Sequence, residues 1–73
     1  MTKTIDTLIA ALTRAARLNN EGYWTHIEYP YQETACKLEY GAVHTNGERE
    51  RAICTTVFMA SRDGVVVQTY TRS

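Results

Sequence analysis

The stretch TACKLEYGAVHTNGERERAICTTVFMAS, residues 34–61, places two partly apolar segments on either side of Asn46-Gly47. Asn-Gly is typical of the tight primed turns that join antiparallel strands, because both residues tolerate positive φ. Asp63-Gly64 is a second signal of the same kind, and it is followed by the apolar run from Val65. The pattern therefore predicts two successive hairpins, with strands at about residues 34–45, 49–61 and 65–72.

Before these strands, the apolar residues recur at helical spacing instead of alternating. They are Ile5, Leu8, Ile9, Leu12, Ala15 and Ala16. Together they predict a helix at about residues 4–19, which ends at Gly22 and packs its apolar stripe on the sheet. The aromatic and β-branched segment that follows predicts a strand at about residues 23–30. The expected fold is α+β: one domain, residues 1–73, with an N-terminal helix on one face of a four-stranded antiparallel meander.

A two-residue turn at each dipeptide fixes which side chains share a face, since cross-strand partners point the same way. Cys36 would then lie opposite Val57, and Val57 opposite Tyr70. The predicted core face, under the helix, consists of Cys36, Leu38, Tyr40, Ala42, Ile53, Thr55, Val57, Met59, Val66 and Tyr70. The predicted outer face consists of Lys37, Glu39, Val43, Cys54, Thr56, Phe58, Ala60, Val67 and Thr69.

Two groups of residues are candidates for partner binding. Phe58 and Val67 form an apolar patch on the predicted outer face, where an exposed aromatic residue favours an interaction surface over an ordinary solvent face. Trp24, Tyr29 and Tyr31 crowd one short segment, and such aromatics are frequent in interface hot spots. The orientation of the first strand stays open: either Tyr23, Ile27 and Tyr29 or Trp24 and His26 face the helix.

The sequence offers little for catalysis, a metal or a cofactor. Cys36 and Cys54 fall on opposite faces in the predicted register, so we expect two free thiols. His26 and His44 complete a set of zinc-type side chains, but the spacing lacks any CxxC or HxxxH pair. No nucleophile motif or phosphate-binding glycine loop is present. We therefore expect a non-enzymatic protein with no metal and no cofactor.

The number and position of the charged residues bear on whether the protein binds nucleic acid. Eight Lys and Arg balance eight Asp and Glu, and this zero net charge disfavours a general nucleic-acid or anionic-membrane binder. Arg49, Arg51 and Arg72 with Tyr70 nevertheless form a local patch that would contact a phosphate or stack on a base. The sequence also lacks a secretory signal or a membrane-spanning apolar run, so a cytoplasmic location is expected.

In organisation the chain resembles the small host-interference proteins of phages and mobile elements, anti-CRISPR proteins among them. The resemblance rests on the single helix Thr4–Leu18, the meander after Gly22 and the tyrosine-rich segment Tyr23–Tyr31. It implies a protein that acts sterically by occupying a surface of another protein or protein complex. The alternatives are a nucleic-acid-binding accessory protein and a purely structural homodimer.

Overall fold

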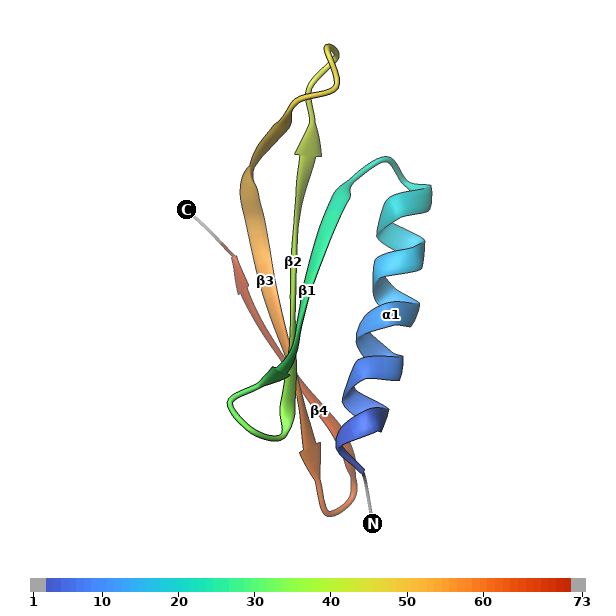
Figure 1. Cartoon of the computed structure of the whole chain (residues 1–73), viewed down its shortest axis with the longest axis vertical. Helices are drawn as coiled ribbons and strands as arrows, with labels where there is room; N and C mark the ends of the chain where they lie inside the picture. The colour runs from blue at the N-terminus through green and yellow to red at the C-terminus, as the bar shows by residue number, and fades with distance from the viewer. Residues whose placement is uncertain (1–2, 72–73) are drawn as a thin grey trace.

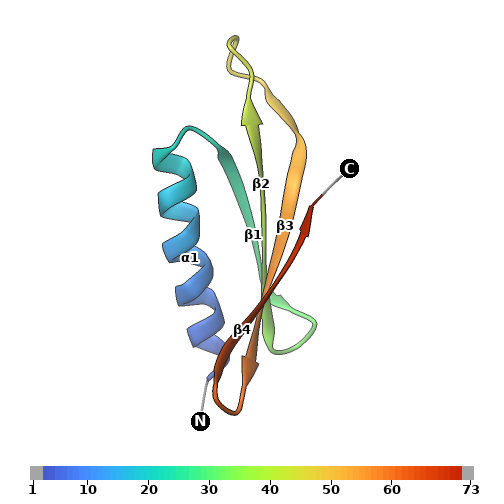
Figure 2. The same ribbon diagram turned by 180° about the vertical axis from the view of Figure 1, so that it is seen from behind.

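The computed structural model describes residues 3–71 and has the predicted α+β architecture. Its elements are α1 (Thr4–Asn20), β1 (Trp24–Tyr31), β2 (Ala35–Val43), β3 (Arg49–Ser61) and β4 (Gly64–Thr71). The strands form one antiparallel sheet in the order β1-β2-β3-β4. Helix α1 lies along one side of this twisted sheet (Figure 1), and the reverse view shows β4 diverging from the helix toward its end (Figure 2). The observed bounds lie within two residues of the expected ones, except that the expected end of the fourth strand, residue 72, lies outside the described residues.

Local chemistry explains both ends of α1. The Asp6 carboxylate accepts a hydrogen bond from the Lys3 backbone N–H at 2.9 Å, which places a negative charge in the first turn. At the other end, Gly22 adopts φ +99°, a left-handed conformation that glycine enters without steric cost. The Tyr23 N–H then donates to the Leu18 carbonyl at 3.0 Å and closes the helix.

The helix presents its small side chains to the sheet. Thr7, Ala11 and Ala15 are buried, whereas Ile5, Ile9 and Leu12 keep 45%, 56% and 51% of their surface exposed. The prediction that the whole apolar stripe packs on the sheet is therefore wrong for these three residues, whereas Leu8 does pack against the core. Small residues in the contact let the helix backbone lie close to the strands. The buried Thr7 hydroxyl costs little there, because it donates to the Thr4 carbonyl at 2.6 Å.

The first hairpin turn has three residues instead of two. The Gly47 N–H donates to the His44 carbonyl at 2.8 Å, and the His44 N–H donates to the Glu48 carbonyl at 2.7 Å. Gly47, the third residue of the turn, has φ +90°. The geometry is that of a type I turn followed by a left-handed residue, the common three-residue hairpin.

Two irregularities in the pairing of β2 with β3 then complete a change of register. Val43 pairs with Arg49, Gly41 with Ala52, and Tyr40 with Cys54, so β3 uses one extra residue in each of the two intervals. Combined with the longer turn, these bulges leave a net shift of one residue from the prediction. Cys36 consequently lies opposite Phe58, and this one-residue shift moves the β3 side chains from Cys54 onward to the face opposite the predicted one.

The second hairpin differs from the prediction without changing the faces. Its two-residue turn is Arg62-Asp63, because Ser61 pairs with Gly64. Phe58 therefore lies opposite Val67, whereas a turn at Asp63-Gly64 would have placed it opposite Thr69. This shift of two residues keeps the alternation between β3 and β4 intact, so β4 follows β3 to the opposite face.

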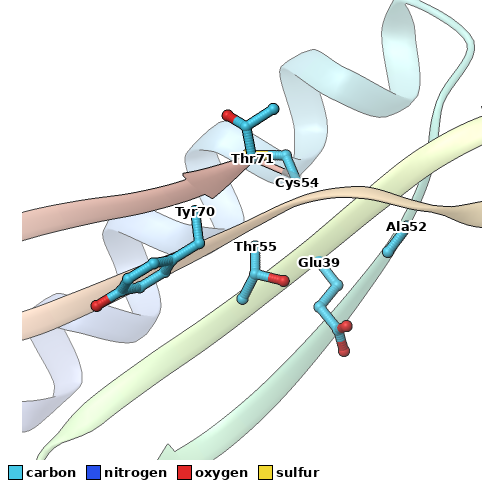
Figure 3. A pocket seen from close by; sticks show the side chains of 6 residues that line it. All are labelled: Glu39, Ala52, Cys54, Thr55, Tyr70 and Thr71. Carbon is cyan, nitrogen blue, oxygen red and sulfur yellow. The ribbon is translucent and has the colours of Figure 1, made fainter. Parts of the chain in front are cut away.

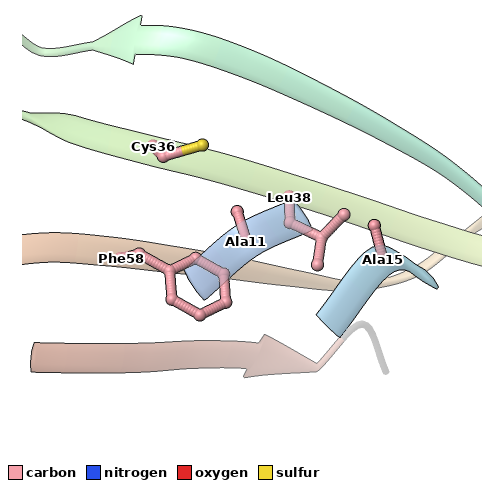
Figure 4. Close-up of a cluster of buried hydrophobic side chains, with 5 residues drawn as sticks. All are labelled: Ala11, Ala15, Cys36, Leu38 and Phe58. Atoms are coloured by element: carbon pink, nitrogen blue, oxygen red, sulfur yellow. The ribbon is translucent and has the colours of Figure 1, made fainter. Parts of the chain in front are cut away.

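The core between α1 and the sheet is small and contains Phe58. Its buried members are Ala11, Ala15, Cys36, Leu38 and Phe58 (Figure 4). Phe58 is 2% exposed, so the predicted Phe58 surface patch is wrong, and the register shift is the physical reason. Ile27 of β1 also packs on this core, which resolves the orientation of the first strand.

Cys36 and Cys54 are both free, as predicted, but for a different reason, and both are buried. They lie on the same face of the sheet, since Cys36 pairs with Phe58 and Cys54 pairs with Tyr40. The two positions are four residues apart along the strands, or about 13 Å at 3.3 Å per residue. A disulfide needs Cα atoms within about 7 Å, so distance along the strands keeps these thiols apart.

Candidate functional site

The face of the sheet turned away from α1 is covered by no other element among residues 3–71 (Figures 1 and 2). We call it the open face. Strand alternation and pairing assign to it Trp24, His26, Glu28, Tyr31, Ala35, Lys37, Glu39, Thr55, Val57, Met59, Val66, Gln68 and Tyr70. This set mixes aromatic, aliphatic and charged side chains, and it brings together residues from all four strands.

Trp24 is held firmly at one end of the open face. Its indole N–H donates to the Glu50 carbonyl at 2.8 Å, and the Arg49 guanidinium lies 5.6 Å from the ring centroid. Trp24 pairs with Gly41, and a Cβ added at Gly41 would lie 2.7 Å from the indole nitrogen. Glycine at this position therefore lets the ring cross β2 and reach β3.

Tyr31 is held at the opposite end by a second cation. The Lys37 ammonium lies 5.3 Å from the centre of the Tyr31 ring, a separation typical of cation–π contacts. Two small aliphatic residues of the open face, Ala35 and Val57, are only 3% and 8% exposed. This end of the face is thus packed, although no helix covers it. Tyr29, the residue before Pro30, remains 37% exposed.

Tyr70 is the most exposed aromatic residue of the open face, at 57%, and its hydroxyl donates to the Gln68 side chain at 2.8 Å. It borders a shallow hollow of about 370 Å³ lined by Glu39, Ala52, Cys54, Thr55, Tyr70 and Thr71. Figure 3 shows Tyr70, Thr55 and Glu39 projecting to the same side of the sheet. Val66, on the same strand and face, is 43% exposed. Together these residues give the open face an accessible, partly apolar region.

The structure separates the sequence-predicted candidates. Trp24 and Tyr31 lie on the open face, whereas Phe58 is in the core and is unavailable to a partner. Val67 lies on the helix side and is 43% exposed. It borders a groove of about 310 Å³ beside α1, which Arg14 and Arg17 also line.

The predicted arginine and tyrosine patch is not assembled as one cluster. Arg49 lies against Trp24, while Tyr70 is on β4 opposite Thr55. Arg51 is exposed on β3, and Arg72 lies outside the described residues. The open face also carries acidic residues, and Glu39 pairs with Lys37 at 3.9 Å. Positive charge is therefore dispersed and partly neutralised on this face.

Sequence reasoning missed Val66, Tyr70 and Thr55 as members of the exposed face, because it assigned all three to the core. It also missed the exposure of Ile5, Ile9 and Leu12. The sequence did contain a signal that the helix has two separate stripes. Ile5, Ile9 and Leu12 are separated by four and then three positions, whereas the small residues Thr7, Ala11 and Ala15 recur every four positions on another side of the helix. No equivalent local signal marked the bulges in β3.

The buried Cys36 thiol is not activated. Burial raises the pKa of the Cys36 thiol, which keeps it protonated and unreactive. The pKa of Tyr40 is raised by burial first, and then by a side-chain hydrogen bond with Cys54. Within residues 3–71, no three His, Cys, Asp or Glu side chains come close enough to hold a metal ion.

The chain matches no protein-family model, no curated protein and no solved structure. Among the described residues, no helix has the length and apolar content needed to cross a membrane.

Proposed function

We propose that this chain is a protein-binding module that recognises its partner through the open face. The observation that carries the proposal is that an uncovered sheet face holds three aromatic residues, Trp24, Tyr31 and Tyr70, from two edge strands. Two of them are fixed by cation–π contacts, so little side-chain entropy remains to be lost on binding. Aromatic anchors held in this way are typical of interface hot spots.

The charges of the open face favour a protein partner over a nucleic acid. Lys37 and Arg49 are offset by Glu28 and Glu39, and both cations already contact aromatic rings. A nucleic-acid platform gains most of its affinity from unneutralised cations that contact phosphates. A mixed surface with aromatic and arginine residues is instead characteristic of protein interfaces.

The proposed mode of action is steric, as the resemblance to small phage interference proteins implies. A sheet face without an activated nucleophile works by occupying a surface of its partner. The proposal includes a reducing, cytoplasmic setting, which two free, buried thiols support. It also retains the expectations of no enzymatic activity and no cofactor.

Affinity capture with matched variants tests this function. Wild-type protein, Tyr70→Lys and Val66→Lys would be immobilised and exposed to a host lysate treated with nuclease. We expect a stoichiometric protein partner on the wild type, loss of that partner from both open-face variants, and its retention by the helix variant Thr13→Lys. A partner that binds all four proteins equally would show that the open face is not the binding surface.

Nucleic-acid binding remains the second candidate, because aromatic residues on an uncovered sheet face are also how many single-strand binders stack bases. The salt dependence of binding separates the two functions. Phosphate contacts lower the logarithm of affinity in proportion to the number of cations involved. We expect the captured partner to persist from low to moderate salt. A steep loss of binding with salt, together with loss on nuclease treatment, would instead support the nucleic-acid function.

A further inference from the structure

Helix α1 carries an apolar stripe that nothing covers among the described residues. Ile5, Ile9, Leu12 and Ala16 are all exposed, the first three by about half. Their separations of four, three and four residues form the narrow seam that α-helices use to pack against one another. The three larger side chains alone expose on the order of 300 Å² of apolar surface, which is the size of the main patch on many monomers.

The stripe points away from the rest of the molecule. At 100° per residue, Ile9 lies roughly 160° around the helix from the buried Ala11. Ile5 and Ala16 lie roughly 120° and 140° from Ala11 in the same sense, and Leu12, at about 100°, forms the edge of the stripe nearer the core. A small side-chain movement would therefore not bury the stripe as a whole. Its burial requires a second molecule, and the thin core of this short chain would gain stability from one.

We propose that the stripe binds a second copy of this chain through antiparallel, two-fold symmetric pairing of the two α1 helices. In such a pair Ile9 of one copy meets Leu12 of the other, and Ile5 meets Ala16. The same two contacts recur in reverse on the other side of the symmetry axis, as an isologous interface requires. Two large side chains fill the centre at each contact, and a large residue meets a small one at each end.

Charge selects the antiparallel direction. Asp6 near the start of α1 and Arg17 near its end lie on the same flank of the stripe, about 20° apart around the helix. Antiparallel pairing brings Asp6 of each copy to within about two residues of the other copy's Arg17 along the axis. Parallel two-fold pairing would place this flank of the two copies on opposite sides of the interface, where Asp6 and Arg17 could not pair, and it would also align the two helix dipoles. The net charge of zero adds no overall repulsion between copies.

This dimer goes beyond the proposed function, because it leaves the open face free on both copies. The interface is small compared with the roughly 800 Å² that each partner contributes to a standard stable complex. We therefore expect a dissociation constant in the micromolar range. Each dimer would present two open faces, so it would bind a repeated partner more tightly than a monomer would.

Sedimentation equilibrium from about 1 µM to 1 mM tests the pairing, since this range brackets a micromolar dissociation constant. We expect a concentration-dependent dimer for the wild type and a monomer for Ile9→Lys and Leu12→Lys, with circular dichroism unchanged because both positions are exposed. Val66→Lys on the open face is the matched control and should dimerise normally. A wild-type monomer over the whole range, or a dimer that survives both helix variants, would overturn the proposal. A dimer lost only in Val66→Lys would also overturn it, and would assign self-association to the open face.

Spin labels test the direction of the helices. A cysteine introduced by Asn20→Cys at the exposed end of α1 would be labelled, with labelling of the wild type as the control for Cys36 and Cys54. The antiparallel dimer predicts a separation of about 30 Å between the two labels, at 1.5 Å per residue along the axis. A separation near 10 Å, the usual spacing of neighbouring helices, would contradict the antiparallel arrangement.

Discussion

The indole of Trp24 crosses the sheet at the bare Cα of its cross-strand partner Gly41. A Cβ at Gly41 would lie 2.7 Å from the indole nitrogen and 2.6 Å from the Arg51 carbonyl oxygen, both closer than carbon contacts allow. This one glycine lets β1 reach across β2, so that the Trp24 indole N–H bonds to the Glu50 carbonyl of β3. This contact connects β1, β2 and β3 at the end of the sheet where the turn between β2 and β3 lies.

Gly41→Ala should destabilise the fold by about 1–3 kcal/mol, as overpacking of a close contact typically does. Urea denaturation measures the loss. The double variant Trp24→Ala with Gly41→Ala should be less destabilised than the sum of the two single variants, because removal of the indole removes part of the clash. Additive effects would show that the indole and the added methyl group do not meet.

Phe58→Ala should lower the free energy of unfolding by about 3–5 kcal/mol, because it empties the centre of the core under α1. Val67→Ala, at the half-exposed position opposite Phe58, is the matched control and should cost about 1 kcal/mol or less. Thermal and urea unfolding of the two variants provide the measurement. A stable, folded Phe58→Lys variant would show instead that Phe58 faces solvent and that the register is the one expected from a two-residue turn.

Ala11→Leu should destabilise the protein by about 1–3 kcal/mol, because Ala11 is fully buried between α1 and the sheet. Ala16→Leu adds the same group to the same helix at an exposed position, and we expect its stability to stay within about 0.5 kcal/mol of the wild type. Both should be measured by thermal unfolding at low micromolar concentration. Equal stability of the two variants would mean that the small residues do not form the contact with the sheet.

The protein should lose stability in alkali. Burial raises the pKa of Cys36 above its ordinary value of 9.0, so the folded state holds this proton more tightly than the unfolded state does. Its contribution is fully present below that pH and is lost as pH rises through the folded-state pKa, because ionisation of the unfolded thiol then favours unfolding. Tyr40, whose pKa is also raised, acts in the same direction above its ordinary value of 10.0.

Urea midpoints compared between about pH 8 and pH 10.5 test this dependence. Cys36→Ala should show a shallower decline than the wild type, because one of the two groups has been removed. A thiol-reactive chromophore at neutral pH gives an independent check: it should detect two thiols in denaturant and almost none in the native protein. Rapid reaction of both cysteines in the native state would contradict their burial.

The sequence by itself determined the elements, because their signals are local. Helical spacing and Gly22 specified α1, and the two turn signals Asn46-Gly47 and Asp63-Gly64 specified the number and order of the strands. Trp24 and Tyr31 were also found from sequence as aromatic candidates, and the structure holds both on the open face. An error of two residues in the position of a strand end does not change the identity or the order of the helix and strands.

Only the tertiary structure decided which side chains face solvent. One extra turn residue and two bulges in β3 left a net shift of one position, and the two-residue alternation of a strand turns that shift into an exchange of faces. Phe58 thereby entered the core while Tyr70 left it. The orientation of α1 was decided in the same way, since close contact with the sheet selected Thr7, Ala11 and Ala15 over the larger Ile5, Ile9 and Leu12. Local periodicity identifies an apolar stripe, but the space between two packed elements determines which stripe fits.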